Sequence, residues 1–145
     1  MKLPLLLLRG TLLALLMVGA GPAAAAGPDA ALTGAYWRAV EISGQPAAPL
    51  PKKREAHLMF SAQGNRVSGS TGCNRFTGTF TQTGDNLHFS PLAITKMACL
   101  PALTAQERAF LAALQATTAM HLAENTLELK DASGQVRMRL EAGPR

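Results

Sequence analysis

Apolar and polar residues alternate in six short segments of the chain, and this pattern predicts three antiparallel hairpins. In chain order the hairpins join 57–61 to 66–70, 75–81 to 87–89, and 127–130 to 136–140. A turn containing glycine separates the two strands of each pair, as at 131–134. In the last strand, Val136, Met138 and Leu140 are expected to face the core. The pattern is typical of an antiparallel sheet with one face in solvent.

A further strand is expected near the start of the domain, within 32–42. Its apolar residues Trp37, Val40 and Ile42 depart from strict alternation, which predicts a β-bulge. The following stretch, 43–54, is rich in glycine and proline and is expected to be an irregular loop. The loop ends with three basic residues, which we interpret as a solvated surface in preference to a phosphate site.

One helix is expected between the second and third hairpins. Thr104 and Glu107 have the spacing of a capping box, which would place the helix start at Thr104 and leave Pro101 upstream of it. Phe110, Leu111 and Leu114 then form an apolar stripe suited to packing on a sheet. We expect the helix to end near 117, where two β-branched residues follow an alanine-rich segment.

The N-terminal segment, residues 1–26, has the pattern of a cleavable signal peptide. Lys2 and Arg9 carry its charges, an apolar run follows, and three alanines at 24–26 provide a small-residue cleavage site. An uncleaved anchor is disfavoured because the run falls short of the ~20 apolar residues that a membrane span needs. The first cysteine is Cys73, which disfavours a lipid anchor. We therefore predict a periplasmic or secreted protein with no stable membrane anchor after cleavage.

The predicted organisation is a signal peptide at 1–26, a flexible lead at 27–31 and one domain at 32–141. Removal of Lys2 and Arg9 from the 14 basic residues of the full chain leaves 12 basic against 9 acidic residues, a formal charge of +3. Nucleic-acid binders usually combine a concentrated basic face with aromatic residues. This weak and dispersed charge therefore argues against a nucleic-acid partner.

The two cysteines, Cys73 and Cys99, are predicted to form a structural disulfide, because thiols are generally oxidised outside the cytosol. The alternatives are a nucleophilic thiol and a metal site. A nucleophile needs a neighbouring base, whereas the three histidines are scattered and lie on the polar sides of strands, where exposure is expected. A zinc site would normally show closely spaced ligand pairs. We predict no metal, and the sequence contains no recognisable catalytic motif.

Residues 72–78 read Gly-Cys-Asn-Arg-Phe-Thr-Gly, and residues 92–99 read Leu-Ala-Ile-Thr-Lys-Met-Ala-Cys. Together with Glu107 and the apolar run at 110–114, these segments closely resemble the META/HslJ domain family. The opening segment and the last hairpin fit the same pattern, so the resemblance covers nearly all of 32–141.

The resemblance implies an α+β fold, in which a curved antiparallel β-sheet, close to a partial barrel, packs against one α-helix. It also implies a bacterial envelope or exported protein. Heat-shock association and novobiocin resistance have been attached to the family, and its fold is similar to that of secretin pilot lipoproteins. No catalytic residues are established for the family, so none is transferred to this chain, and no cofactor is expected.

We interpret the motif residues as structural: Gly72, Asn74, Arg75, Gly78, Thr95 and Met97. Gly72 and Gly78 suggest positions that need a permissive backbone or a close approach. Asn74 is a candidate for local hydrogen bonding to the backbone where the chain enters the strand. Arg75 could pair with a carboxylate or bind an anion, and fold maintenance is favoured because the neighbouring Cys73 is expected to be structural.

The sequence therefore predicts a non-enzymatic exported protein that supports envelope integrity or stress resistance by binding a protein or an apolar ligand. A half-open barrel with one helix can leave an apolar cleft, the usual kind of ligand site. One alternative is a protein-binding inhibitor or a module resembling a secretion pilot. The other is a thiol-dependent enzyme, which two free thiols in the exported protein would favour. No ligand-binding residue and no individual partner is assigned.

Overall fold

The computed structural model describes residues 19–21, 27–52 and 54–144. The predicted signal peptide, 1–26, lies outside these residues except for 19–21. None of the helices in the described segments is long and apolar enough to cross a membrane.

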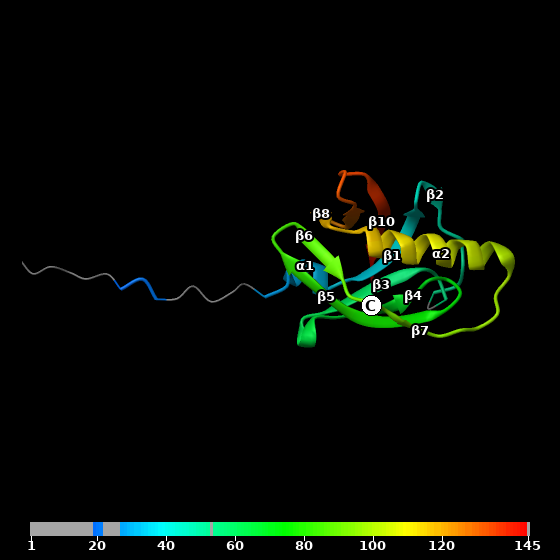
Figure 1. Ribbon diagram of the computed structural model, residues 1–145, viewed down its shortest axis with the longest axis horizontal. Coiled ribbons are helices and arrows are strands. Elements are labelled where there is room, and N and C mark those ends of the chain that lie inside the picture. The colour runs from blue at the N-terminus through cyan, green and yellow to red at the C-terminus, as the bar shows by residue number, and fades with distance from the viewer. Residues whose placement is uncertain (1–18, 22–26, 53, 145) are drawn as a thin grey trace, which may run out of the picture.

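The described chain consists of one long helix, one short helix, a short 3-10 helix and ten strands (Figure 1). The helices are α1 (Ala30–Thr33), the 3-10 helix η1 (Gln63–Asn65) and α2 (Pro101–Ala116). The strands are β1 (Tyr36–Ile42), β2 (Gln45–Pro46), β3 (His57–Ser61), β4 (Arg66–Ser70), β5 (Arg75–Thr83), β6 (Asn86–Phe89), β7 (Ala93–Ile94), β8 (Ala119–Ala123), β9 (Thr126–Lys130) and β10 (Val136–Gly143). The three predicted hairpins are confirmed as β3–β4, β5–β6 and β9–β10.

The sheet closes into an eight-stranded antiparallel barrel, because β1 pairs with β10 at the far end of the chain. Around the ring the order is β1, β3, β4, β5, β6, β8, β9 and β10, while β2 and β7 pair outside it. The prediction of a partial barrel is therefore wrong in one respect: the barrel is closed. Closure satisfies the backbone groups that the two edges of an open sheet would expose. The predicted bulge in β1 is confirmed as a register shift between Ala39 and Glu41.

Large apolar side chains fill the barrel, as expected for a ring of eight strands. The fully buried residues include Trp37, Leu58, Phe76, Phe80, Leu87, Phe110, Leu114, Leu127, Leu129, Met138 and Leu140. Phe60 and Phe80 meet edge to face with ring centroids 5.0 Å apart, and Phe76 meets Phe110 of α2 at 5.5 Å. The Trp37 indole donates to the carbonyl oxygen of Leu32 at 2.9 Å, which ties α1 to the core. The barrel interior is thus filled by side chains, and an open hollow of about 210 Å³ lies between α2 and the segment from β6 to β7.

The long helix α2 starts three residues earlier than the sequence indicated. Leu100 is its N-cap and makes no side-chain cap hydrogen bond, and Pro101 occupies the first turn. Proline is well suited to that position, since the first amides of a helix have no partner within the helix. The predicted capping box of Thr104 and Glu107 is therefore wrong, and Glu107 bonds to the β4–β5 connection instead.

Several elements were not predicted. α1 begins at Ala30, within the segment 27–31 that the sequence indicated as a flexible lead, and the Asp29 side chain caps it by accepting from the amide of Ala31. β8 completes the barrel, joining β6 through the single paired position Asn86–Ala119 and β9 along its whole length. Its sequence, Ala-Met-His-Leu-Ala, contains few of the β-branched and aromatic residues that favour strands.

Candidate functional site

The motif residue Asn74 is a buried hub that holds three segments together. Its side-chain amide donates to both carboxylate oxygens of Glu107 on α2, at 3.2 and 3.0 Å. Its side-chain oxygen accepts from the Thr95 hydroxyl at 3.0 Å and from the Met97 amide at 2.7 Å. The prediction of local bonding to the backbone is therefore wrong for this side chain, since these partners lie more than 20 residues away in sequence. Asn74 connects the β4–β5 turn to the helix and to the segment that follows β7.

The same turn is fastened to α2 by a second set of bonds. The Thr71 hydroxyl donates to Glu107 at 2.7 Å, and the Gln106 amide donates to the Thr71 carbonyl at 2.9 Å. Gly72 has a φ of +95°, and a Cβ there would overlap the Gln106 amide. Glycine fits because it adopts positive φ without a steric penalty and leaves room for Gln106.

Gly78, the other motif glycine, allows a close approach of a different kind. A Cβ at this position would lie 2.5 Å from Cδ2 of Leu92. Leu92 belongs to the connection between β6 and β7 and packs against the core beside β5. The predicted role of Gly78, close approach of another segment, agrees with this packing.

Cys73 and Cys99 lie at disulfide distance, with their Cα atoms 5.9 Å apart. That spacing is typical of a disulfide bridge. Cys73 lies in the β4–β5 turn, and Cys99 lies two residues before α2. The pair therefore links the same two segments that Asn74 joins by hydrogen bonds. A disulfide at this position is compatible with an oxidising, extracytoplasmic environment.

An open groove of about 500 Å³ runs across the outer surface of the barrel, over β1, β3, β4 and β5. We call it the outer groove, and it is lined by Tyr36, Lys52, His57, Met59, Ser68, Gly69, Arg75, Phe76 and Thr77. The strand register explains its shape. Met59 pairs with Ser68, and Ser68 pairs with Thr77, so the small residues of β4 form the floor between larger neighbours.

Aromatic rings form one wall of the outer groove. The rings of Tyr36 and His57 are stacked, with centroids 4.5 Å apart. The Tyr36 hydroxyl donates to Glu55 at 3.0 Å, and the Lys52 ammonium lies 5.8 Å from the Tyr36 ring centroid. Lys52 also donates to the Pro144 carbonyl at 3.0 Å. These contacts fix an apolar wall with a cation at its edge.

His57 is 6% exposed, so the prediction that the histidines lie on the exposed surface is wrong for this residue. Its alternation position does face outward, but the Tyr36 ring covers it. Burial lowers the pKa of His57 below its ordinary value. Two effects raise the pKa and oppose this shift: the hydrogen bond between Nδ1 and the Glu55 carbonyl, at 2.9 Å, and the negative charge of Glu55. The positive charge of Arg75 lowers the pKa of His57 further.

This lowered pKa predicts that His57 weakens the fold as the medium becomes mildly acidic. The unfolded chain then binds a proton at His57 before the folded chain does, so the free energy of unfolding falls as the pH drops through the unfolded pKa of about 6.5. Urea unfolding at about pH 7.5 and about pH 5.5 should therefore give a smaller difference for His57→Gln than for the wild type. The exposed His121→Gln is the control, and equal pH dependence in the wild type and both variants would contradict the assignment.

Arg75 lines the outer groove at the start of β5, where it pairs with Ser70 of β4. Its side chain is exposed, and no carboxylate pairs with its guanidinium among the residues that the structure describes. Of the two roles considered from the sequence, an ion pair within the fold is therefore not seen among the described residues, and anion binding stays a prediction. A guanidinium can hold a carboxylate or phosphate through two parallel hydrogen bonds.

A second open hollow, of about 590 Å³, adjoins the outer groove at Arg75. We call it the disulfide hollow, and it is lined by Arg54, Ser70, Gly72, Cys73, Arg75, Met97, Ala98, Cys99, Leu100 and Leu103. Its lining includes two arginines and no acidic residue. The disulfide-distance pair thus lies in the wall of a basic surface hollow.

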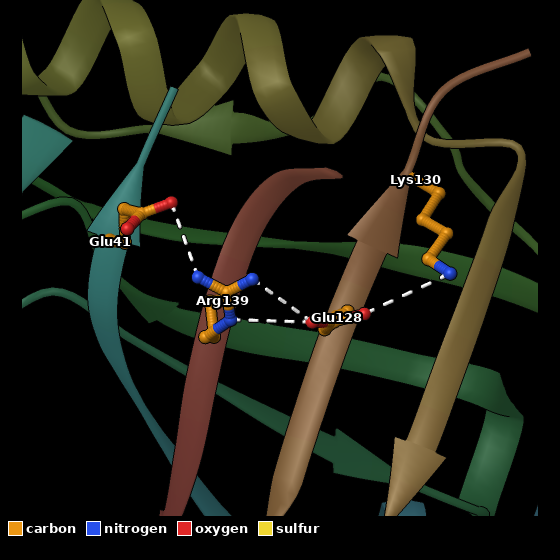
Figure 2. Close-up of polar contacts among 4 residues, drawn as sticks. All are labelled: Glu41, Glu128, Lys130 and Arg139. Atoms are coloured by element: carbon orange, nitrogen blue, oxygen red, sulfur yellow. Dashed lines mark hydrogen bonds and ion pairs between the residues drawn. The ribbon is translucent and has the colours of Figure 1, made fainter. Parts of the chain in front are cut away.

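The carboxylates of the barrel are concentrated on a different face, formed by β1, β10 and β9. There Arg139 lies between Glu41 and Glu128, with N–O distances of 3.4 and 3.1 Å, and Glu128 also contacts Lys130 at 3.8 Å (Figure 2). These side chains come from neighbouring positions on adjacent strands. Exposed pairs of this kind contribute little to stability, but they neutralise one face of the barrel. In the part of the chain that the structure describes, the cations lining the outer groove and the disulfide hollow form no ion pairs of this kind.

The groove combines apolar walls with an unpaired cation, which is an arrangement suited to binding. In the described part of the chain, no group of three or more histidine, cysteine, aspartate or glutamate side chains is placed to hold a metal. From the sequence, Arg75 had two possible roles, an ion pair and anion binding, and the two cysteines were predicted to form a disulfide. The sequence did not indicate the roles of Tyr36, Met59 and Ser68, because these residues converge only once β1, β3 and β4 are paired.

Comparisons with solved structures give the same fold. An NMR structure shares 25% identity with this chain, covers 77% of it and 91% of its own length, and has a TM-score of 0.61. An NMR structure of a protein from Burkholderia xenovorans shares 24% identity, with coverage of 88% and 100% and a TM-score of 0.60. A crystal structure of a DUF4847 family protein from Bacteroides vulgatus shares 16% identity, with coverage of 79% and 96% and a TM-score of 0.59. A search of curated proteins gives no significant match.

The family comparison is more direct. The sequence profile of the META domain matches residues 30–144, which include the whole barrel, both helices and the Asn74 hub. The resemblance seen in the motif residues is thereby confirmed over most of the chain. The chain belongs to the META domain family.

Proposed function

We propose that this META-domain protein is a non-enzymatic exported binding protein, which supports the cell envelope under stress by binding an apolar ligand with an anionic group. The ligand lies in the outer groove, with its apolar part against Tyr36 and Met59 and its anionic group at Arg75. The observation that carries this proposal is the exposed, unpaired guanidinium of Arg75 at the edge of an apolar groove.

The electrostatics of the groove support an anion over a cation. Lys52 and Arg75 both line it, and Glu55, a carboxylate beside the wall, accepts a hydrogen bond from Tyr36. The lowered pKa of His57 keeps its ring uncharged at neutral pH, so that ring adds apolar surface rather than charge. The reactive groups near the groove are also engaged: the cysteines lie at disulfide distance and His57 bonds to a backbone carbonyl.

The size of the groove supports a single chain of moderate length. A cavity of about 500 Å³ lies within the usual range for small-molecule sites. Because the barrel interior is filled by aromatic and aliphatic side chains, the proposal places the ligand outside the barrel rather than within it.

The test uses dodecanoate below its micelle concentration as the probe, titrated into the protein in its exported form and followed by calorimetry. Dodecanoate is expected to bind, and Arg75→Gln is expected to weaken binding by roughly tenfold, because a charge-assisted hydrogen bond is lost. Arg66→Gln is the matched control, since Arg66 is exposed on β4 but lines neither the outer groove nor the disulfide hollow. Uncharged dodecanol should bind the wild type more weakly than dodecanoate.

Two results would contradict the proposed function. One is the absence of dodecanoate binding by the wild type. The other is an equal loss of dodecanoate affinity in Arg75→Gln and Arg66→Gln. That result would show that binding depends on the overall charge of the protein and not on the outer groove. The circular dichroism spectra of all variants should coincide, because both arginines are exposed.

A further inference from the structure

Two large apolar side chains in the lining of the disulfide hollow are unusually exposed. Met97 is 62% exposed and Leu100 is 73% exposed, the highest values among the exposed large hydrophobic residues of the described chain. They lie on either side of Cys99, on the connection that leads from β7 into α2. Figure 1 shows this connection extending beyond the strands at one end of the barrel. The two side chains therefore project from an outer part of the molecule.

The exposure is imposed by a backbone that is held on both sides. The Met97 amide donates to Asn74 at 2.7 Å, and the Thr95 amide donates to the Arg75 carbonyl at 3.0 Å. Cys99 is at disulfide distance from Cys73, and Leu100 is the N-cap of α2. Because the backbone is restrained at these positions, Met97 and Leu100 cannot turn into the core without breaking these contacts. The backbone of the apolar pair is held in place, which lowers the ordering cost on binding to that of the side chains.

Cations surround the apolar pair. Lys96 is exposed next to Met97, while Arg54 and Arg75 line the adjoining hollow. Among the described residues, none of these three cations has a carboxylate partner. The ion pairs of the described chain lie instead on β1, β9 and β10 and the turn after β9 (Figure 2). Three cations without an ion pair, Arg54, Arg75 and Lys96, therefore lie where the apolar pair projects, although others of the described chain, such as Arg66, lie elsewhere.

We propose that this face, defined by Lys96, Met97, Leu100, Arg54 and Arg75, docks reversibly on an anionic phospholipid membrane. A bilayer with acidic headgroups matches both features, because it offers a negatively charged surface and apolar chains just below it. Met97 and Leu100 enter the headgroup boundary, while the cations contact the phosphates. The absence of acidic residues from the lining of the hollow favours this occupant over a protein surface, which usually presents charges of both signs.

This inference goes beyond the proposed ligand-binding function, because its apolar contacts, Met97 and Leu100, lie outside the outer groove, although the two sites share Arg75. The two hollows meet at Arg75, so docking would bring the outer groove close to the membrane. The test therefore varies Met97 and Leu100, and leaves Arg75 unchanged. Failure of membrane docking and failure of dodecanoate binding can then be told apart.

The experiment measures flotation of the exported protein with lipid vesicles. Vesicles of phosphatidylglycerol and phosphatidylethanolamine should bind the wild type, whereas vesicles of phosphatidylcholine should not. The double variant Met97→Ser, Leu100→Ser should bind the anionic vesicles at least roughly tenfold more weakly. A second double variant, Arg54→Gln, Lys96→Gln, should show a similar loss, and raising the salt from about 20 mM to about 300 mM should weaken wild-type binding.

The matched control is Arg66→Gln, which removes an exposed cation that lines neither the outer groove nor the disulfide hollow and should leave vesicle binding unchanged. All variants share the same N-terminal residues, so differences in their vesicle binding arise from the substituted side chains alone. The circular dichroism spectrum of Met97→Ser, Leu100→Ser should match that of the wild type, which shows that the variant is folded, and its dodecanoate binding should persist. The proposal is overturned if anionic and neutral vesicles bind equally, or if the double variant binds like the wild type. Binding only to envelope vesicles, abolished when their proteins are digested, would indicate a protein partner and would also overturn it.

Discussion

Replacing Asn74 by alanine is expected to lower the free energy of unfolding by about 3 kcal/mol. The variant loses the bonds from the Asn74 amide to Glu107 and the bonds that its oxygen accepts from Thr95 and Met97. One of these partners is a carboxylate, and hydrogen bonds to charged groups contribute more than neutral ones. Since Asn74 is 3% exposed, water has little access to replace the lost partner. The effect should be large for a single polar side chain.

Urea unfolding of Asn74→Ala and the wild type measures this loss. Asn86→Ala provides the control, because Asn86 is exposed at the start of β6 and should change the free energy of unfolding by less than about 0.5 kcal/mol. A loss below about 1 kcal/mol for Asn74→Ala would show that the network is dispensable, and would contradict the role assigned to the hub.

Removing both cysteines, as Cys73→Ser and Cys99→Ser together, is expected to lower the free energy of unfolding by about 3.5 kcal/mol. The two residues are 26 apart in sequence, and a bridge across such a loop restricts the unfolded chain by roughly that amount in the chain-entropy description. The neighbouring Asn74 network should keep the folded segment in place. Most of the effect should therefore arise in the unfolded state.

Unfolding with and without reductant measures this effect. Reductant should destabilise the wild type to the level of the double serine variant, and it should leave that variant unchanged. Thiol titration of the native exported protein should find no free thiol. Two titratable thiols, together with a wild type that reductant leaves unchanged, would contradict the bridge and would favour the thiol-dependent enzyme instead.

The two perturbations act on the same contact between the β4–β5 turn and the segment before α2. The losses in free energy of unfolding caused by Asn74→Ala and by the double cysteine variant should therefore not be additive when the changes are combined. Once Asn74 is lost, the disulfide still restrains Met97 and Leu100, whereas loss of both should release the segment. In this chain the adjacent Cys73 and Asn74 would then each limit a different movement of the same loop.

The hairpins could be predicted from the sequence because their signals are local. Alternation and turn residues lie within a few positions of one another, as in β9 and β10. Closure of the barrel could not be predicted in this way. It depends on β1 meeting β10, with Tyr36 opposite Gly143, and no local pattern records a contact across more than 100 residues. β8 was missed for a different reason, since its composition resembles that of a helix or loop.

Two side chains show where tertiary contacts reverse a local expectation. Glu107 has the right spacing from Thr104 for a helix cap, yet it bonds to Thr71 and Asn74, because the helix already starts at Pro101. His57 occupies an outward position on β3, yet Tyr36 from β1 covers it. In both cases the partner comes from an element distant in sequence. The outer groove was unpredictable for the same reason, because its walls come from separate strands.

The most direct test of the central claim is an NMR titration of the exported, ¹⁵N-labelled protein with dodecanoate. We expect the largest shift changes at amides of the outer groove, around Met59, Ser68 and Thr77, and at the Arg75 side chain. The indole signal of Trp37, inside the barrel, should remain in place. If the Trp37 indole and the core residues shift most, the ligand enters the barrel, and the assignment of the outer groove as the binding site is wrong.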